Sequence, residues 1–386
     1  MLKIAIIHPG LEAGGGSESC ALWLAENLKK DYKVTLITTC VPDFEKLNRA
    51  YGTNLSDGQV YTIVVRRPVF FPEKFSAFRN RFPRFCKRIS PKFDVMISTY
   101  NPMDFGKKGI QIIADLNFDW ELSRKYNRGL DFEKVIYKDS LYRKFYLKIA
   151  EILRGAQGDW KKNTTISLSQ WLANRMKESF GTESSVVYPP VLSEFPDTPF
   201  GQRENGFILI GRIWPEKEIE KVIRILKTVR RSNPNIHLHI IGRAYDSRSD
   251  YSSLIKELCA ENKEWCFFEG EMYGQKKLDF IASHKYGISG RSYEPWGIAV
   301  AEMAKAGCVV FVPNGGGQLE IVDSPDLVYN DEDDAVKKIK KVLGAKDLQA
   351  ILQNHLFMQG HKFSVERFVR EARKVIDEFI HKLAGC

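Results

Sequence analysis

The sequence predicts an α/β protein of two domains, each built on a parallel β-sheet. Continuous apolar segments such as LKIAIIH (2–8) alternate along the chain with segments of helical periodicity. Strands that are apolar without interruption are typical of parallel sheets covered by helices on both faces. A polar, Pro-rich segment interrupts the alternation near the middle of the chain. The length of 386 residues also suits two domains better than a single core.

The first half of the sequence opens with a β-α-β unit. The strand 2–8 precedes a helix expected over 17–30, and KVTLITT (33–39) follows as the second strand. The other predicted strands are TIVVRR (62–67), FDVMIST (93–99) and GIQIIAD (109–115), and SSVVYPPV (184–191) closes this half of the chain. Helices are expected over most of 137–153 and over 171–180. These elements form the predicted N-terminal domain, residues 1–190.

The alternation restarts after a linker predicted over 191–205. Residues 206–363 form the predicted C-terminal domain, in which strands such as GFILIGR and IHLHIIGR alternate with helices such as EIEKVIRILKTVRR. Residues 364–386 form an amphipathic helix that is expected to pack back on the N-terminal domain. The predicted architecture is therefore two Rossmann-like domains facing a central cleft, with ligands bound beyond the carboxyl ends of the strands.

Charge and composition narrow the function classes. The formal net charge of +10 favours an anionic partner, which is nucleic acid, a nucleotide or an anionic membrane surface. No apolar run reaches the roughly 18 to 20 residues that cross a bilayer, and MLKIAIIHPG has too short an apolar core for a signal peptide. We therefore expect a cytoplasmic protein. The histidines show no metal-ligand spacing, and the acidic run 331–334 is interpreted as the charged start of a helix, so no metal is predicted.

A glycine-rich loop, HPGLEAGGGSES, follows the first strand. Gly14, Gly15 and Gly16 would let backbone N–H groups approach a phosphate at the N-terminus of the next helix. The loop matches neither G-x-G-x-x-G nor the P-loop pattern, which disfavours hydride transfer and NTP hydrolysis. From these residues alone, phosphate or sugar binding and a flexible loop with a helix cap are equally open.

Two basic residues follow the first strand of the second domain, in GRIWPEK. Arg212 offers a fork of donors and Lys217 a point charge, and together they suit a diphosphate. Ordinary surface charge is the alternative. Pro215 and Glu216 are expected to begin the helix that follows.

The stretch SYEPWGIAVAEMAKAG (292–307) contains two carboxylates. Glu294 is predicted at the ligand-facing end of the sheet, and Glu302 about two turns inside an apolar helix that ends at Gly307. A carboxylate in so apolar a helix is costly unless it accepts hydrogen bonds, which the two hydroxyls of a ribose would donate. A solvent-facing Glu302 is the alternative. A second glycine loop, 315–317, is expected at the same end of the sheet.

Together these motifs resemble those of the retaining GT-B glycosyltransferases of the large family 4, the glycosyl transferases group 1. The resemblance covers nearly the whole chain and rests on the N-terminal glycine loop, G-R-x-x-P-E-K, S-x-E-P-W-G-x-x-x-x-E and G-G-x-x-E-I-V. HPGLEAGGGSE and VVYPPV look most like α-mannosyltransferases that extend lipid-linked oligosaccharides. The resemblance implies a metal-independent hexosyltransferase without further cofactor. It would move a sugar from GDP-mannose or a UDP-sugar to a lipid-linked or polysaccharide acceptor.

The resemblance also implies roles for individual residues. The groups so assigned are Arg212 and Lys217 for the donor diphosphate, Glu294 for the donor sugar, Glu302 for the ribose, the backbone amides of Gly297 and Ile298 for phosphate or sugar, and Gly15 and Gly16 for the diphosphate and acceptor. Negative charge that builds on the leaving diphosphate would be stabilised by these cations. The leaving phosphate would take the proton of the acceptor, with retention of anomeric configuration.

One departure from the family pattern concerns a histidine that many members carry after a first-domain strand. Here the strand reads GIQIIADLNFDW, and the position falls on Ala114 or Asp115. Either Asp115 takes the role, or Asp119 does, or the acceptor chemistry differs. A catalytically impaired nucleotide-sugar or glycan-binding protein therefore stays open as an alternative, with a UDP-sugar epimerase as a lesser one. A nucleic-acid-binding protein would leave both glutamates and both glycine loops unexplained, so no nucleic acid is expected.

A basic and aromatic segment runs over residues 66–93. Its part from Arg66 to Lys92 has nine Lys or Arg, one Glu and six Phe. Cations interleaved with Phe fit an anionic membrane surface, so we expect a peripheral membrane protein. A Phe-rich core helix with a solvated basic face is the alternative.

Overall fold

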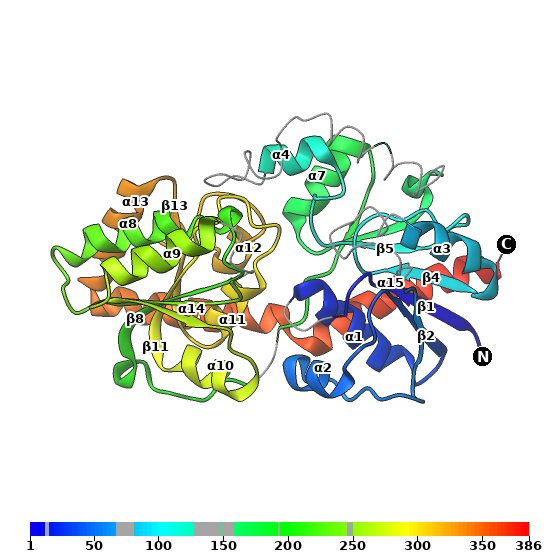
Figure 1. Cartoon of the computed structure of the whole chain (residues 1–386), viewed down its shortest axis with the longest axis horizontal. Coiled ribbons are helices and arrows are strands. Elements are labelled where there is room, and N and C mark those ends of the chain that lie inside the picture. The colour runs from blue at the N-terminus through cyan, green and yellow to red at the C-terminus, as the bar shows by residue number, and fades with distance from the viewer. Residues whose placement is uncertain are drawn as a thin grey trace. The chain divides into compact units, whose positions relative to one another are not determined.

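The computed structural model describes residues 1–11, 15–66, 81–126, 148, 158–191, 194–244 and 250–385. The chain divides into two compact units, drawn in Figure 1. Unit 1 contains Met1–Phe118, Lys138–Pro190 and Val365–Cys386, and unit 2 contains Asp119–Tyr137 and Val191–Ser364. The C-terminal segment therefore belongs to unit 1, although residues Val191–Ser364 of unit 2 separate it in the sequence from the rest of unit 1.

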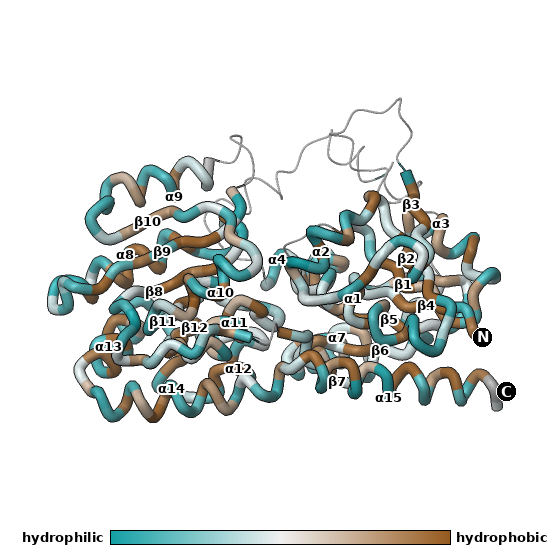
Figure 2. The backbone as a smooth tube through the Cα atoms, turned by 90° about the horizontal axis from the view of Figure 1, so that it is seen from below, coloured by the Kyte–Doolittle hydropathy of each residue, from teal (hydrophilic) through white to brown (hydrophobic). Residues whose placement is uncertain are grey.

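Unit 1 is built on a parallel sheet with the strand order β3-β2-β1-β4-β5-β6-β7. The strands are β1 (Lys3–Ile7), β2 (Lys33–Thr38), β3 (Tyr61–Val64), β4 (Val95–Ser98), β5 (Ile110–Ile113), β6 (Thr164–Ser167) and β7 (Ser185–Val186). Figure 2 shows the hydrophobic colour concentrated along the strands, and the inner residues of β1 are fully buried. This burial is what the unbroken apolar run 2–8 predicts for a strand covered on both faces.

The helices of unit 1 end where the local sequence stops them. They are α1 (Gly16–Leu28), α2 (Phe44–Tyr51), α3 (Arg81–Ile89), α7 (Gln170–Phe180) and α15 (Val365–Ala384). Ser169 caps α7 by accepting a hydrogen bond from the Leu172 N–H at 3.0 Å, and Gly181 closes it with φ 66°. The predicted helix 171–180 is thus confirmed. The predicted helix 137–153 falls, apart from residue 148, outside the described residues.

The C-terminal helix α15 buries one stripe of apolar side chains. The residues of this stripe are Val365, Phe368, Ala372, Ile376 and Phe379, each less than 10% exposed. Their spacing of three and four residues places them on one face of a helix, and Figure 2 shows hydrophobic and hydrophilic residues alternating along α15. Polar contacts with unit 1 flank the stripe: Arg373 pairs with Asp31 at 2.5 Å, and the Tyr32 hydroxyl lies 3.3 Å from Asp377.

Unit 2 repeats the same strand order on a second parallel sheet, β10-β9-β8-β11-β12-β13. The strands are β8 (Glu204–Ile210), β9 (His237–Ile241), β10 (Cys266–Gly270), β11 (His284–Ile288), β12 (Val309–Pro313) and β13 (Val328–Tyr329). The helices are α4 (Trp120–Tyr126), α8 (Ile219–Arg230), α9 (Asp250–Glu261), α10 (Gly274–Ala282), α11 (Ile298–Lys305), α12 (Leu319–Val322), α13 (Glu332–Leu343) and α14 (Lys346–Gly360).

The helices of unit 2 cover both faces of its sheet. In Figure 1, α8, α9 and α13 lie on one side of the sheet and α10 on the other. Right-handed crossovers produce this arrangement, because the chain moves outward from β8 to β10 and then returns to build β11 to β13 on the other flank. Asp331 caps α13 by accepting from the Asp334 N–H at 2.8 Å, which confirms the interpretation of the acidic run as a helix start.

Both sheets reverse their strand order at one place, between β1 and β4 in unit 1 and between β8 and β11 in unit 2. Loops that leave the carboxyl ends of the strands on either side of such a reversal diverge to opposite faces, and the space between them is where doubly wound sheets bind ligands. A ligand site in unit 2 is therefore expected at the residues that follow β8 and β11.

The basic segment 66–93 is described only in part, because residues 67–80 lie outside the described residues. In the described part, α3 turns Phe82, Cys86 and Ile89 into a core cluster that also contains Phe93. These side chains pack inside unit 1, as in the alternative of a Phe-rich core helix with a solvated basic face. Among the described helices, none is long and apolar enough to cross a membrane.

Candidate active site

The loop after β8 brings Arg212 and Lys217 to the switch point of unit 2. The sequence predicts a helix that starts at Pro215, but the structure has a single 3-10 turn over Pro215–Lys217 and starts α8 at Ile219. Glu218 between them has φ 48°, which breaks the run. Its carboxylate accepts hydrogen bonds from both the N–H and the hydroxyl of Ser292, at 2.9 and 2.7 Å. The left-handed residue thus ties this loop to the loop after β11.

Five side chains from the two loops form one ionic network. Lys217 Nζ lies 2.6 Å from Glu294 Oε2, and Arg291 Nη1 lies 3.1 Å from Glu294 Oε1. Arg291 Nη1 is also 3.6 Å from Glu216 Oε1, which Arg212 Nη2 approaches to 3.0 Å. Three cations thus surround two carboxylates, which leaves a formal charge of one positive unit (3 − 2). The Arg212 side chain is 55% exposed, whereas those of Arg291 and Glu216 are below 10%.

The cations hold both carboxylates in the charged form. Burial raises the pKa of Glu294, but the charges of Arg291, Lys217 and Arg212 and the Lys217 hydrogen bond outweigh it and hold this pKa at about 2. The pKa of Glu216 is also lowered, because Arg291, Arg212 and Lys217 outweigh its burial. Neither group is therefore a proton donor at neutral pH, and both serve to fix the positions of the cations.

Glycines let the loop after β12 approach the loop after β11 closely around Glu294. Glu294 forms a β-bridge with Gly316, and its carbonyl accepts from the Gly317 N–H at 2.8 Å. A Cβ on Gly316 would lie 2.1 Å from the Glu294 carbonyl oxygen, and Gly316 has φ 78°. Gly297 has φ 103° and is the N-cap of α11, so Ile298 is the first helical residue. The amide groups at this helix N-terminus lie three residues beyond Glu294.

Glu302 lies inside α11 and is 7% exposed, but it has a cationic partner. Lys277 Nζ on α10 lies 2.8 and 2.7 Å from its two carboxylate oxygens. The alternative of a solvent-facing Glu302 is therefore wrong, and the predicted cost of a buried carboxylate is offset by Lys277. A carboxylate has about four acceptor positions, so this pair leaves Glu302 capacity for further donors.

In unit 1, Gly15 and Gly16 begin α1 after the switch-point strand β1. Gly15 exchanges two hydrogen bonds of 3.0 Å with the Tyr51 hydroxyl, one through its N–H and one through its carbonyl. A Cβ on Gly15 would lie 2.1 Å from the Glu18 carboxylate, so a larger residue there would require the Glu18 side chain to move. Gly16 is the first helical residue. Gly14 lies outside the described residues.

His8 directly follows β1. It was not among the site residues predicted from the sequence. The Gly10 N–H donates to its Nδ1 at 3.3 Å, which places the ring proton on Nε2, 3.1 Å from the Ser17 hydroxyl. Its ring meets that of Tyr100 edge-on at 5.6 Å. Burial lowers the pKa of His8 to about 4, so the ring is neutral at pH 7. Unit 1 therefore has a histidine at its switch point, although not on the strand where the family pattern predicts one.

Asp115, beyond the end of β5, is fixed by amide groups. Its carboxylate accepts from Asn101 Nδ2 at 2.7 Å and from both the N–H and Nδ2 of Asn117 at 2.9 Å. Asn101 itself has φ 66°. Asp119, by contrast, accepts from the Leu122 N–H at 3.0 Å at the start of α4. Asp119 thus has a local capping role, whereas Asp115 is held at the ligand-facing end of the sheet.

Residues 193–355, which include Arg212, Lys217, Glu294 and Glu302, match the family described as glycosyl transferases group 1. The chain carries a glycosyl transferases group 1 domain. This domain lies within unit 2 and contains the whole ionic network around Arg291.

Solved structures extend the likeness in fold to both units. A GDP-Man:Man(3)GlcNAc(2)-PP-Dol alpha-1,2-mannosyltransferase of Candida glabrata is 27% identical to this chain over 203 residues. The match covers 48% of this chain and 38% of the length of that relative. The solved structure of HepE from Anabaena in complex with UDP and glucose has a TM-score of 0.71 at 12% identity, and the match covers 98% of this chain and 100% of HepE. The glycosyltransferase WaaG has a TM-score of 0.71 at 14% identity over 97% of this chain and 99% of WaaG. The chain thus has the fold of GT-B glycosyltransferases.

Proposed function

We propose that the chain is a retaining glycosyltransferase that moves a sugar from a nucleotide-diphosphate donor to a glycan or lipid-linked acceptor. The observation that carries this proposal is the ionic network of Arg212, Lys217 and Arg291 around two charged carboxylates at the switch point of the group 1 domain. Its net positive charge suits a diphosphate. Gly297 and the glycine loop 315–317 in the same unit allow the close approach that a phosphate needs.

The network would act on the leaving group. When the bond between sugar and phosphate breaks, negative charge grows on the diphosphate, and cations already held in place lower the barrier without reorganising. Lys217 and Arg291 are positioned by Glu294, and Arg212 by Glu216. The amide groups at the start of α11, from Gly297 and Ile298, supply further positive potential. Side-chain cations would thus do the work of a metal ion, and we propose a metal-independent reaction.

Glu294 would contact the donor sugar. Its low pKa keeps it ionised, so it would accept hydrogen bonds from sugar hydroxyls and would not protonate a leaving group. In the proposed mechanism the acceptor proton passes to the departing phosphate. Asp115 and the loop of Gly15 and Gly16 in unit 1 would serve the acceptor and the diphosphate, and no step requires Asp115 to carry a proton.

Donor and acceptor are proposed as classes. The name of the Candida glabrata relative states that it transfers mannose from GDP-mannose to a dolichol-linked oligosaccharide. The structure of HepE was solved with UDP and glucose. We therefore propose GDP-mannose or a UDP-sugar as the donor and a lipid-linked or polysaccharide glycan as the acceptor. Contact with the membrane surface, proposed on the charge of residues 66–93, would depend on the basic side chains of this segment and not on Phe82.

A panel of donors tests the proposal. Thermal shift with UDP, GDP and ADP should identify one nucleotide that raises Tm, because a ligand that binds only the native state stabilises it. Transfer or slow hydrolysis of the matching nucleotide-sugars should then release that nucleoside diphosphate. Binding without release would instead establish a nucleotide-sugar-binding protein, and interconversion of the sugar without release would establish an epimerase. Either of these outcomes would overturn the proposal.

Replacing Glu302 by alanine should weaken donor binding more than it slows the bound complex. A hydrogen bond to a charged group is worth about 1.5–3 kcal/mol, so we expect the donor Kd to rise by roughly 10- to 150-fold, with kcat within about threefold of wild type. Calorimetry measures the donor Kd, and initial rates measure kcat. Glu264→Ala, an exposed residue of the same unit, is the matched control. A donor Kd that stays at the wild-type value in Glu302→Ala would refute contact with the ribose.

A further inference from the structure

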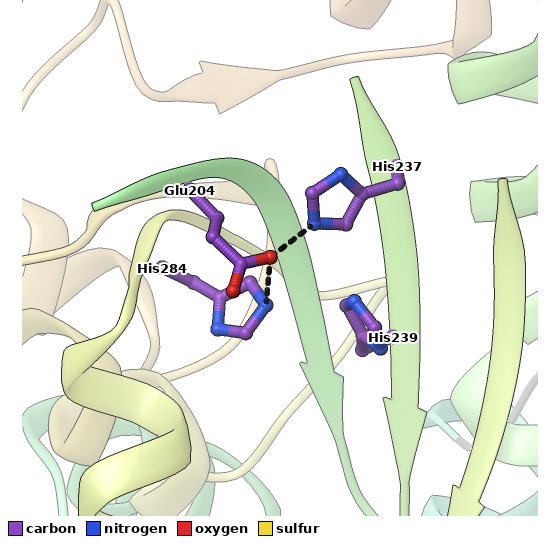
Figure 3. A group of neighbouring side chains, drawn as sticks. All are labelled: Glu204, His237, His239 and His284. Carbon is purple, nitrogen blue, oxygen red and sulfur yellow. Dashed lines mark ion pairs between the residues drawn. The ribbon is translucent and has the colours of Figure 1, made fainter. Parts of the chain in front are cut away.

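Three of the seven histidines meet at the edge of the unit 2 sheet that is opposite to the ionic network. His237 is the first residue of β9, His284 is the first residue of β11, and Glu204 is the first residue of β8, which lies between them. His239 follows two residues after His237, on the same face of β9. Figure 3 shows the four side chains, which we call the His3Glu cluster, gathered over these strand ends.

The four side chains lie close enough to share one ion. Each offers one ligand atom, and these atoms all lie within 4.8 Å of one another. Glu204 Oε2 is 3.3 Å from His237 Nε2 and 3.9 Å from His284 Nε2. The ring centroids of His239 lie 5.0 Å from those of His237 and 4.9 Å from those of His284.

Two of the rings are already held as metal ligands usually are. His284 Nδ1 lies 2.7 Å from the Phe280 carbonyl, so Nδ1 carries the proton and Nε2 bears the lone pair. His239 Nδ1 lies 2.8 Å from the Glu269 carboxylate, which fixes the same tautomer. A histidine that donates its other N–H to a carbonyl or a carboxylate is the common second shell of a metal site, because that bond orients the ring and raises its basicity.

The other side of the rings has unmet hydrogen-bonding capacity. The Nε2 atoms of His237 and His284 are buried and accept no hydrogen bond within the described residues. Gly206 makes space beneath them, because a Cβ there would lie 2.4 Å from His237 Nε2 and 2.4 Å from His284 Cδ2. Burial of a polar nitrogen without a partner is costly, and a bound cation would remove that cost.

Glu204, whose side chain is 61% exposed, connects the cluster to solvent and gives an ion a way in.

We propose that Glu204, His237, His239 and His284 bind one divalent transition-metal ion, with Zn²⁺ as the preferred ion. Three imidazoles and one carboxylate match the ligand types and the four-coordinate geometry of protein zinc sites. Zinc bonds of about 2.0–2.1 Å place tetrahedral ligand atoms about 3.3 Å apart, so the cluster would contract slightly on binding. Glu204 Oε2 already lies at about this spacing from His237 Nε2, at 3.3 Å.

The proposed ion would have a structural role. Strand β8 extends from Glu204 toward Arg212 with a rise of about 3.3 Å per residue, so the His3Glu cluster lies roughly 20 Å or more from the ionic network. An ion there would tie together the starts of β8, β9 and β11. Its removal should lower the stability of unit 2, and this effect is separable from the sugar-transfer chemistry of the proposed function.

The test is metal binding by the full chain without a histidine tag. After incubation with Zn²⁺ and dialysis, elemental analysis should find about one Zn²⁺ per chain, and Zn²⁺ should raise Tm. Substitution with Co²⁺ should give the intense visible absorption of a tetrahedral site. We expect His237→Gln and Glu204→Gln to lose at least tenfold in Zn²⁺ affinity. His381→Gln, which changes an exposed histidine of α15, should bind as wild type does.

A substitution outside the ligand set separates this site from adventitious binding. Glu269→Gln leaves all four ligands in place but removes the carboxylate that orients His239, and we expect it to weaken Zn²⁺ binding about 10- to 100-fold. Less than about 0.2 Zn²⁺ per wild-type chain, or equal Zn²⁺ affinity in wild type, His237→Gln and Glu269→Gln, would overturn the proposal. Sugar transfer by Glu269→Gln at saturating donor should stay near the wild-type rate, so failure of this inference is distinct from failure of the proposed function.

Discussion

Replacing Lys217 or Arg212 by alanine is expected to cost roughly 2 to 4 kcal/mol of transition-state stabilisation, by analogy with the loss of one oxyanion donor. The expected fall in kcat/KM is about 30- to 1,000-fold. Lys217 should show the effect mainly in kcat, because its ammonium group is held 2.6 Å from Glu294 before the donor binds and gains most as charge develops on the diphosphate. Initial rates across donor concentrations would separate the two constants.

The control for Lys217 is a lysine in the same unit with an exposed ion pair. Lys341 pairs with Asp326 at 2.7 Å and its side chain is 58% exposed, so Lys341→Ala should leave transfer unchanged. Glu294 retains Arg291 as a partner in Lys217→Ala, so this variant should stay folded. Rates within threefold of wild type in both Lys217→Ala and Arg212→Ala would remove the diphosphate role.

Replacing Arg291 by methionine is expected to destabilise the protein by about 3–5 kcal/mol, because it takes one of two cationic partners away from each of two buried carboxylates. Arg291 is 7% exposed and lies against both Glu216 and Glu294. Urea denaturation at pH 7 measures the change. Arg243→Met is the matched control, since Arg243 pairs with Glu271 at the surface with a side chain that is 53% exposed. Such a pair is worth at most about 1 kcal/mol.

Two further measurements test the cause of this loss. Adding Glu216→Gln to Arg291→Met should restore part of the stability, because it removes the charge of one of the two carboxylates that lost Arg291 as a partner. The pKa of Glu294 is about 2 in the native state, below its ordinary 4.5, so its ion pairs stabilise the native state above pH 4.5 and are lost as the pH falls toward 2. The difference between Arg291→Met and wild type should therefore shrink below pH 4.5. A difference that is constant with pH would point to packing instead of charge.

The strands that the sequence predicted best are those with unbroken apolar runs. Segment 2–8 contains β1, and the apolar run of segment 206–212 forms most of β8, because burial on both faces leaves no polar interruption. Strand β6 was missed because its sequence TTIS is short and three of its four residues are polar. Helix α2 was missed for a similar reason, since eight residues carry only two turns of periodicity.

The site residues that were predicted are those that stand in local sequence motifs. The partners that form ion pairs with them were not predicted. Glu294 and Lys217 stand in recognisable motifs, but nothing in RSYEPWG shows that Arg291 would hold two carboxylates. Lys277 is one of two adjacent lysines on α10, and only the packing of α10 beside α11 brings it to Glu302. Partners that come from a different element require the tertiary fold, which local spacing does not encode.

The His3Glu cluster was missed because its spacing was judged along the chain. Ligands on a zinc-binding helix or loop show a short repeat, whereas Glu204, His237 and His284 come from three strands and are 33 and 47 residues apart. The visible local signal was the pair His237 and His239 in IHLH, since alternate residues of a strand share a face. In a parallel sheet, a histidine at the start of each of two predicted strands is the corresponding long-range signal.

Helix α15 sets the order in which this protein can become complete. Ribosomes extend the chain from its N-terminus, so residues 1–190 emerge early, yet the apolar stripe from Val365 to Phe379 that unit 1 packs against emerges only after almost all of unit 2. Unit 2 ends at Ser364, so all of it has emerged before α15 does. The first-made half of the protein is therefore the last to be finished, and until then it presents to solvent, or to chaperones, the surface that α15 will cover.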